Sequence, residues 1–176
     1  LRAMPRMQVY RPADAVETAV GWKVALGSRE TPTALALSRQ KTAALEHTDE
    51  TVAGAEKGGY VLAEADGGKP DGILIGTGSE VELALEAQKT LADKGHKVRV
   101  VSMPCWELFE QQSDSYKEQV LPAGVGKRVA VEAGCTQGWE RYVGREGAVV
   151  GINRYGESAP GPVVYEKLGI TADAVV

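Results

Sequence analysis

The sequence predicts an α/β fold. Short and almost wholly apolar runs recur along the chain, as is typical of strands buried in a parallel sheet. Most of them are followed by a segment whose apolar residues repeat at helical spacing. Glycine, proline and aspartate mark the turns between these segments. Strands that alternate with helices in this way predict a mainly parallel sheet covered by helices.

The first part of the chain predicts a strand–helix–strand unit. Met7 to Tyr10 has the pattern of a short strand. Asp14 is a candidate N-cap, and Glu17 stands three residues later as its capping-box partner. The helix that follows ends at Gly27, and the apolar run from Thr33 to Leu37 predicts a buried strand. This unit has the form of the edge of a larger doubly wound domain.

The second part predicts a three-layer α/β/α domain with a mostly parallel, five-stranded sheet. The expected strands are Gly59–Ala63, Ile73–Gly76, Lys97–Met103, Arg128–Val131 and Ala148–Ile152. The first expected helix is capped by Ser79. Further helices are expected at Trp106–Phe109, at Tyr116–Leu121, around Trp139 and Tyr142, and at Pro162–Leu168, and Thr171 caps the last one. We expect the first strand to be antiparallel, because the short turn from Asp66 to Gly72 cannot make a parallel crossover.

These patterns divide the chain into residues 1–40, which form the strand–helix–strand unit, and residues 58–176, which form the three-layer domain. Residues 41–57 are rich in charge and threonine and have no strong periodicity, so we interpret them as an interdomain linker, although they could carry a loose turn of helix. Because Leu1 is not an initiator methionine and the chain begins close to a strand, we expect a fragment of a longer protein.

Composition excludes several classes of protein. The 176 residues are 43% hydrophobic and 25% charged, which is ordinary for a soluble globular protein. No apolar run has the length that crosses a bilayer, and no secretory signal is visible, so we expect no membrane contact. The net charge of −4 gives no basic footprint for nucleic acid.

Cys105 and Cys135 have no CxxC spacing and no neighbouring histidine. We therefore expect two reduced thiols. The alternative is a redox pair, because both cysteines would follow strands at the same edge of the sheet.

Arg39 is the main candidate for a functional residue. It follows the apolar strand in the segment Ser38-Arg39-Gln40. Open α/β sheets bind ligands at the carboxyl ends of their strands. A guanidinium group offers a planar fork of donors that stays charged and suits a phosphate monoester. A surface arginine in an ordinary salt bridge is the alternative.

Other candidates are weaker. The turn from Gly76 to Glu80 could bind an anion, which leaves a nucleotide-binding module as an alternative, but a plain turn with Ser79 as helix cap fits better. Glu132 ends a buried strand and could be catalytic or could hydrogen-bond a neighbouring domain. His47 and His96 have no partner nearby in sequence, and no cluster of metal ligands is visible.

Four aromatic side chains, Trp106, Phe109, Trp139 and Tyr142, lie near helix starts and helix faces. We predict that they pack in a core or between domains, because large aromatic rings in such positions serve packing more often than ligand stacking.

Several segments together resemble transketolase. They are Arg11-Pro12-Ala13-Asp14, the strand ending in Ser38-Arg39-Gln40, the strand and turn Ile73–Val81, Trp106-Glu107-Leu108-Phe109 and Gly156-Glu157-Ser158-Ala159-Pro160. The resemblance runs from Leu1 to about Val176 and covers the last quarter or so of such an enzyme. It implies that residues 1–40 are the end of the pyrimidine-binding domain and residues 58–176 the C-terminal domain.

The resemblance also implies an activity. Transketolases move a two-carbon ketol unit between sugar phosphates with thiamine diphosphate and Mg²⁺ or Ca²⁺, and they are homodimers. In the family, the arginine that matches Arg39 helps to hold the substrate phosphate, with Ser38 beside it in the motif. The enzyme would be cytoplasmic or, since Trp106–Phe109 looks like the plant branch, stromal in a chloroplast, in the pentose phosphate pathway or the Calvin cycle.

The family motifs that bind the cofactor and metal and carry the catalytic residues are not in this sequence. The fragment itself is therefore expected to be inactive and to hold no cofactor, contributing structural, dimer and phosphate contacts. The alternatives are the C-terminal part of deoxyxylulose-phosphate synthase or of a 2-oxoacid dehydrogenase β chain, or a stand-alone binding or scaffold module. Residues 1–40 are too few to bury a core and should expose apolar surface or pack on a partner.

Overall fold

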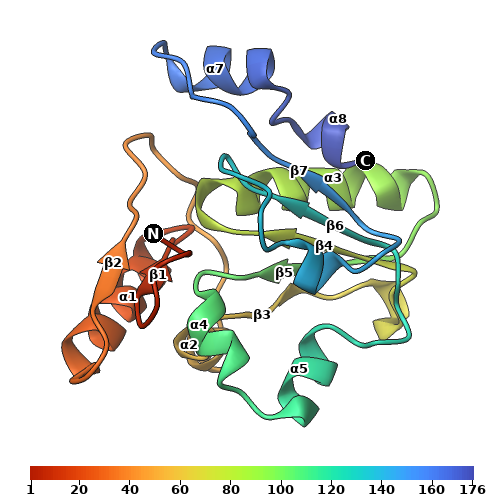
Figure 1. Cartoon of the computed structure of the whole chain (residues 1–176). Coiled ribbons are helices and arrows are strands. Elements are labelled where there is room, and N and C mark those ends of the chain that lie inside the picture. Colours follow the sequence, from red (N-terminus) through yellow and green to blue (C-terminus); the bar gives the residue numbers. More distant parts are fainter.

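The computed structural model describes residues 1–176 and has two sheets (Figure 1). In the first, β1 and β2 pair in parallel. In the second, the strands lie in the order β3-β5-β4-β6-β7, and β3 is antiparallel to β5 while the other pairs are parallel. The predicted α/β fold, with a five-stranded sheet and one antiparallel strand, is confirmed.

The N-terminal unit consists of β1 (Gln8–Tyr10), α1 (Ala15–Gly27) and β2 (Thr33–Leu35), and α2 (Asp49–Glu56) follows it. The larger unit consists of β3 (Tyr60–Ala63), η1 (Asp66–Gly68), β4 (Gly72–Gly76), η2 (Gly78–Glu80), α3 (Val81–Asp93), β5 (Val98–Ser102), α4 (Trp106–Glu110), α5 (Asp114–Val120), β6 (Arg128–Val131), α6 (Glu140–Val143), β7 (Ala148–Val150), α7 (Gly161–Leu168) and α8 (Ala172–Val175).

Strand alternation divides the larger unit into two cores, one on each face of its sheet. On one face, Ile73 and Ile75 pack with α4, α5 and α6. On the other face, Leu74 packs with α3 and α8. Helices therefore cover both faces of the sheet, which confirms the predicted three layers. The four aromatic residues that the sequence assigns to packing, Trp106, Phe109, Trp139 and Tyr142, all lie in the first of these cores.

A third core joins the two units. Tyr10 and Val20 of the N-terminal unit pack with Ala55 of α2 and with Tyr60 and Cys105 of the larger unit. The hydroxyl of Tyr10 donates to the backbone oxygen of Ala55. Burial of these side chains makes the two units one packed body rather than two tethered ones.

The interpretation of residues 41–57 as a plain linker is incomplete. Residues 49–56 form α2, which contacts α1 and β3. Thr48 caps this helix in a capping box whose second member is Thr51. The helix has a weak apolar periodicity because small residues, among them Gly54, form its buried face, so the sequence pattern does not show it.

Several predicted boundaries differ. β2 ends at Leu35 rather than Leu37, β7 ends at Val150 rather than Ile152, and Trp139 precedes α6. Asp14 accepts from the Glu17 backbone as predicted, but the Glu17 side chain accepts from Ala13 and not from Asp14.

Ser79 does not cap α3, because a short 3-10 turn (η2) intervenes and no side chain caps the helix.

The redox-pair alternative for the cysteines is wrong. Both are free, Cys105 buried and Cys135 exposed. They follow β5 and β6, and β4 lies between these two strands. Burial raises the pKa of the Cys105 thiol to about 12, so it stays protonated and unreactive.

The packing of α2 gives a stability test. A Cβ atom at Gly54 would overlap Cβ of Tyr60, which cannot move without its backbone. We expect Gly54→Ala to lower the free energy of unfolding by about 1–3 kcal/mol through overpacking. Gly27→Ala is the matched control, since a Cβ there meets nothing, and it should raise stability by up to about 1 kcal/mol. Urea unfolding of both variants measures the difference; equal effects would contradict this packing.

Candidate functional site

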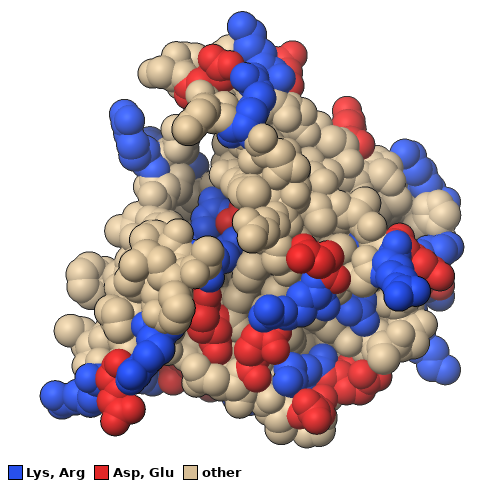
Figure 2. All heavy atoms as spheres, viewed as in Figure 1, with Lys and Arg blue, Asp and Glu red and all other residues tan.

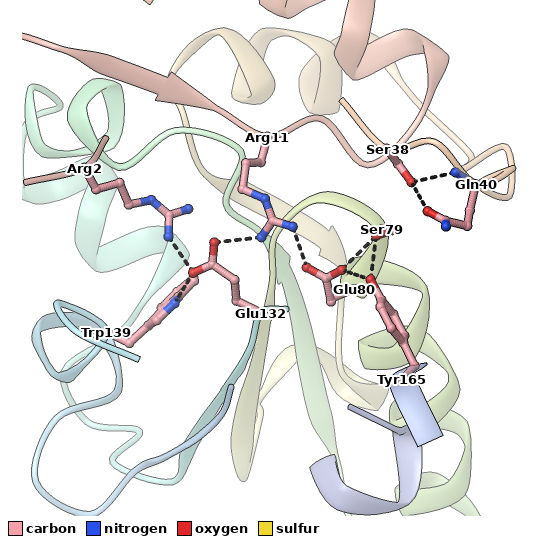
Figure 3. A network of polar contacts seen from close by, with 9 residues as sticks. All are labelled: Arg2, Arg11, Ser38, Gln40, Ser79, Glu80, Glu132, Trp139 and Tyr165. Atoms are coloured by element: carbon pink, nitrogen blue, oxygen red, sulfur yellow. Dashed lines mark hydrogen bonds and ion pairs between the residues drawn. The ribbon is translucent and has the colours of Figure 1, made fainter. Parts of the chain in front are cut away.

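The carboxyl ends of the strands of both sheets carry the candidate functional residues. β1 is followed by Arg11, β4 by the turn that contains Glu80, and β6 by Glu132. Ser38 and Arg39 lie in the loop beyond β2, and Figure 3 draws Ser38 together with the polar network. A network of charged and polar side chains thus brings together the ends of β1, β4 and β6, and the loop after β2 contacts the start of α7.

Arg11 binds two carboxylates of the larger unit at once. Its Nη2 donates to Glu80 Oε2 at 2.9 Å, and its Nη1 donates to Glu132 Oε1 at 2.7 Å (Figure 3). The side chain of Glu80 is fully buried, and that of Glu132 is 6% exposed. We call this group of three side chains the Arg11 clamp. It forms a charged link between the two units.

The backbone around Arg11 fixes its position. The Arg11 N–H donates to the Pro104 carbonyl at 2.8 Å, and the Gly78 N–H donates to the Arg11 carbonyl at 3.1 Å. Gly78 has φ +63°, and a Cβ there would lie 3.2 Å from Arg11 Nη2. The turn after β4 therefore needs glycine both for its left-handed backbone and for the close approach of the guanidinium.

The clamp occupies the place where such sheets usually bind ligands. β4 is the central strand, and the chain continues to β5 on one side and then crosses to β6 on the other. The crevice outside β4 and β6 is thus the topological switch point. Because Arg11 fills it, the turn from Gly76 to Glu80 holds a carboxylate against a guanidinium of the same chain. The alternative of an anion cradle at this turn is less favoured, because Glu80 places a negative charge there.

Electrostatics favour the charged form of the clamp. Burial by itself lowers the pKa of Arg11, but Glu80 and Glu132 outweigh it, and the pKa lies above its ordinary value. Buried carboxylates require such a partner, since an uncompensated buried charge is strongly destabilising.

Glu132 has two further partners. Arg2 Nη1 donates to Glu132 Oε2 at 2.5 Å, and Trp139 Nε1 donates to the same oxygen at 2.7 Å. The Arg2 guanidinium lies over the Trp106 ring, 3.9 Å from its centre. Of the two roles considered for Glu132, the structure supports hydrogen bonding to a neighbouring unit.

Tyr165 connects α7 to the clamp. Its hydroxyl donates to Glu80 Oε1, and Ser79 Oγ donates to the same oxygen at 2.7 Å. Ser79 Oγ and the Tyr165 hydroxyl lie 3.0 Å apart. Burial and the Glu80 charge raise the pKa of Tyr165 to about 12, so the phenol remains a donor at neutral pH.

Glu17 forms a second polar link between the units. It is fully buried on α1 and accepts from Tyr60 OH at 2.8 Å, Ser102 Oγ at 2.5 Å and the Ala13 N–H at 2.6 Å. Burial raises its pKa above the ordinary range, although these donors oppose the shift.

His47, which has no partner nearby in sequence, contacts Asp14 Oδ2 through Nε2 at 3.0 Å across 33 residues of chain.

Arg39 and Ser38 differ from the clamp in being exposed. Arg39 makes no ion pair or hydrogen bond in the structure, so its donors are free. Ser38 Oγ accepts from the Gln40 N–H at 3.3 Å and donates to Gln40 Oε1 at 3.4 Å. The expected salt bridge of an ordinary surface arginine is not formed here.

A cavity of about 640 Å³ opens beside the clamp. Arg2, Arg11, Glu132 and Trp106 form part of its wall. No group of three or more histidine, cysteine, aspartate and glutamate side chains that could hold a metal ion is present, and no helix is long and apolar enough to cross a membrane.

Sequence reasoning missed the roles of Arg11, Glu80 and Tyr165. Arg11 carries the same signal as Arg39, a cation that follows an apolar strand. What the sequence does not show is that its partners follow β4 and β6.

The fold and the site define a class of protein: an α/β chain in which a three-layer domain docks, through strand ends, on the edge unit of a second doubly wound domain. Two family models match the chain. The model of the transketolase pyrimidine-binding domain matches residues 1–44, and that of the transketolase-like C-terminal domain matches residues 58–171.

Known proteins are similar over the whole chain. Transketolase-1 of Arabidopsis thaliana chloroplasts is 53% identical over 176 residues, 99% of this chain and 24% of the relative. The solved transketolase of Leishmania mexicana is 46% identical with a TM-score of 0.91, covering 100% of this chain and 25% of that one. The Pichia stipitis transketolase in complex with sedoheptulose 7-phosphate is 41% identical with a TM-score of 0.90, covering 99% and 25%. The chain belongs to the transketolase family and spans about a quarter of the length of these relatives.

The Arg11 clamp gives a direct test of docking. We expect Arg11→Ala to lower the free energy of unfolding by about 3–5 kcal/mol, because the fully buried Glu80 loses its cation and Glu132 keeps only Arg2. Denaturant unfolding measures the loss, and a double-mutant cycle with Glu132→Gln should show coupling.

Lys23→Ala is the matched control for this test. It removes an exposed ion pair with Glu56 and should change stability by less than about 1 kcal/mol. A clamp variant as stable as this control would contradict the assignment.

Proposed function

We propose that this chain is the C-terminal part of a transketolase that transfers a two-carbon ketol unit from a ketose donor to an aldose acceptor, both sugar phosphates. Membership of the family over the whole chain carries the proposal. The Pichia stipitis relative has been solved with sedoheptulose 7-phosphate, and structures of its mutants hold xylulose 5-phosphate and fructose 6-phosphate. Similar sugar phosphates are the proposed substrates here.

In this proposal, residues 1–40 are the end of the pyrimidine-binding domain, residues 41–57 connect the domains, and residues 58–176 are the C-terminal domain. Deoxyxylulose-phosphate synthase and the 2-oxoacid dehydrogenase β chain are less favoured, since the matched relatives are transketolases. A stand-alone scaffold is less favoured because α1 leaves Trp22 52% and Leu26 75% exposed. In Figure 2 the middle of the surface over the N-terminal unit is largely uncharged, and charged side chains gather at its lower end.

That apolar face supports a partner surface in the whole enzyme. The exposed positions Trp22 and Leu26 are one helical turn apart on α1, so they form one stripe. We propose a homodimer, located in the cytoplasm or a chloroplast stroma. The predicted exposure of apolar surface by residues 1–40 is confirmed.

Arg39 and Ser38 are the proposed phosphate contacts. The Arg39 donors are free and exposed beyond the carboxyl end of β2. A guanidinium binds a phosphate with two parallel hydrogen bonds, and it keeps its charge at any working pH. Ser38, with its side chain directed to Gln40, shapes the loop that presents Arg39.

Thiamine diphosphate would supply the carbanion chemistry of the reaction. The residues of this chain do not fit that group: no metal-ligand cluster is present, and Arg11 fills the crevice of the larger sheet. In the proposed enzyme, other parts of the polypeptide hold the cofactor and a divalent cation such as Mg²⁺ or Ca²⁺. This chain binds and orients the phosphate end of the sugar.

The phosphate contact is tested in the full-length enzyme. We expect Arg39→Ala to raise the KM for xylulose 5-phosphate roughly 10- to 100-fold, the worth of one hydrogen-bonded charge pair, with a smaller change in kcat. The KM for unphosphorylated xylulose should stay the same. Steady-state kinetics with both donors measures this.

Arg29→Ala is the matched control for this test, since Arg29 is also exposed but precedes β2. An unchanged KM for xylulose 5-phosphate in Arg39→Ala would refute the assignment.

A second test concerns the chain by itself. We expect no ketol transfer and no heat of thiamine diphosphate binding from purified residues 1–176. Hydrogen exchange should be faster in α1, which packs on few neighbours, than in β4 and β5, which are buried throughout. Measurable turnover by the pure chain would contradict the proposed division of the active site.

A further inference from the structure

The start of α7 contacts the loop that carries Arg39. Gly161 is the first residue of this helix. A Cβ atom there would lie 2.9 Å from Gln40 Nε2 and 3.0 Å from Gln40 Cγ, so the Gln40 side chain rests directly on Gly161. Gly161 does not have a positive φ, so its small size is what this contact needs.

The Arg39 loop has few other anchors. At its start, the Ala36 N–H donates to the Tyr10 carbonyl at 2.9 Å. At its end, the Leu45 N–H donates to Asp14 Oδ2 at 3.1 Å. Between these two points the loop makes only the hydrogen bonds between Ser38 and Gln40. The contact of the Gln40 side chain with Gly161 therefore fixes the middle of the loop, next to Arg39.

α7 is itself held by the clamp. Tyr165 donates to Glu80, and Glu80 accepts from Arg11. In Figure 3, Ser38 and Gln40 lie on the side of the network where Ser79 and Tyr165 meet. A chain of contacts thus runs from the clamp through Tyr165 along α7 to Gly161, and from there to the loop.

We propose that Gly161 and Tyr165 of the C-terminal domain are positioning residues for phosphate binding by Arg39. The inference rests on the proposed function and gives the C-terminal domain a role in substrate specificity. A loop held in one place loses less conformational freedom when the phosphate binds, so affinity for the phosphorylated sugar rises. The reacting carbons are untouched, so kcat should not depend on these residues.

The experiment uses the full-length enzyme, or a chimaera in which this chain replaces the matching quarter of Arabidopsis thaliana transketolase-1. Gly161→Ala displaces the Gln40 side chain without straining the helix. Tyr165→Phe removes only the hydroxyl that holds α7 on Glu80. Gly156→Ala is the matched control, because a Cβ at Gly156 meets nothing. Kinetics are measured with xylulose 5-phosphate and with unphosphorylated xylulose.

We expect Gly161→Ala and Tyr165→Phe each to raise the KM for xylulose 5-phosphate by about threefold or more, with kcat and the KM for xylulose as in the parent. Gly156→Ala should match the parent. Equal effects on both donors would show a merely structural role and overturn the inference. Parent-like values in both variants would also overturn it.

Arg39→Ala separates this inference from the proposed function. If Arg39→Ala raises the KM for xylulose 5-phosphate and the α7 variants do not, only the positioning role falls. If Arg39→Ala itself has no effect, the proposed phosphate site falls.

Discussion

The structure depends on one arginine that neutralises two buried carboxylates. Glu80 and Glu132 follow neighbouring parallel strands, so the fold of the larger unit brings both acids to the same edge. Both side chains are buried and so need a cationic partner, and Arg11 reaches both from the other unit, with Arg2 as a second partner of Glu132. Docking of the N-terminal unit therefore supplies the positive charge that the larger domain needs in order to bury Glu80 and Glu132. The same link sets the strand ends of the two sheets against each other and brings α7 to the Arg39 loop.

Arg11 and Arg39 show how burial decides what a residue type does. Each follows a short parallel strand of the same small sheet. Arg11 is enclosed by two acids, and its donors are satisfied within the chain. Arg39 lies in a loop with its donors free. The switch-point crevice of the larger sheet, a usual place for a ligand, is filled by Arg11, so free binding capacity remains at the loop after β2.

Local patterns in the sequence predicted the strands, most helices and the antiparallel β3, since apolar runs and turn residues determine these. They did not predict α2, because its buried face is made of small residues such as Gly54 and Ala55. Ser79 looked like a helix cap and instead bonds Glu80 and Tyr165. The sequence shows that Arg11 follows a strand, but it does not identify the partners of Arg11, because they lie 69 and 121 residues away along the chain. Contacts between residues so far apart depend on the order of the strands in the sheet, and a short stretch of sequence does not reveal that order.

The distance in sequence between Arg11 and Glu132 also imposes an order on synthesis. At the usual 5–20 residues per second, about 6–24 s pass between translation of the arginine and of its second acid. The small sheet is complete once β2 has been made, but Glu80 follows Arg11 only after 69 residues and Glu132 only after 121, so Arg11 lacks one or both of its acids throughout that interval. The link that holds the two units together is thus among the last to close on a ribosome. Contacts of such range slow folding, so the nascent N-terminal unit is the stretch most in need of a chaperone.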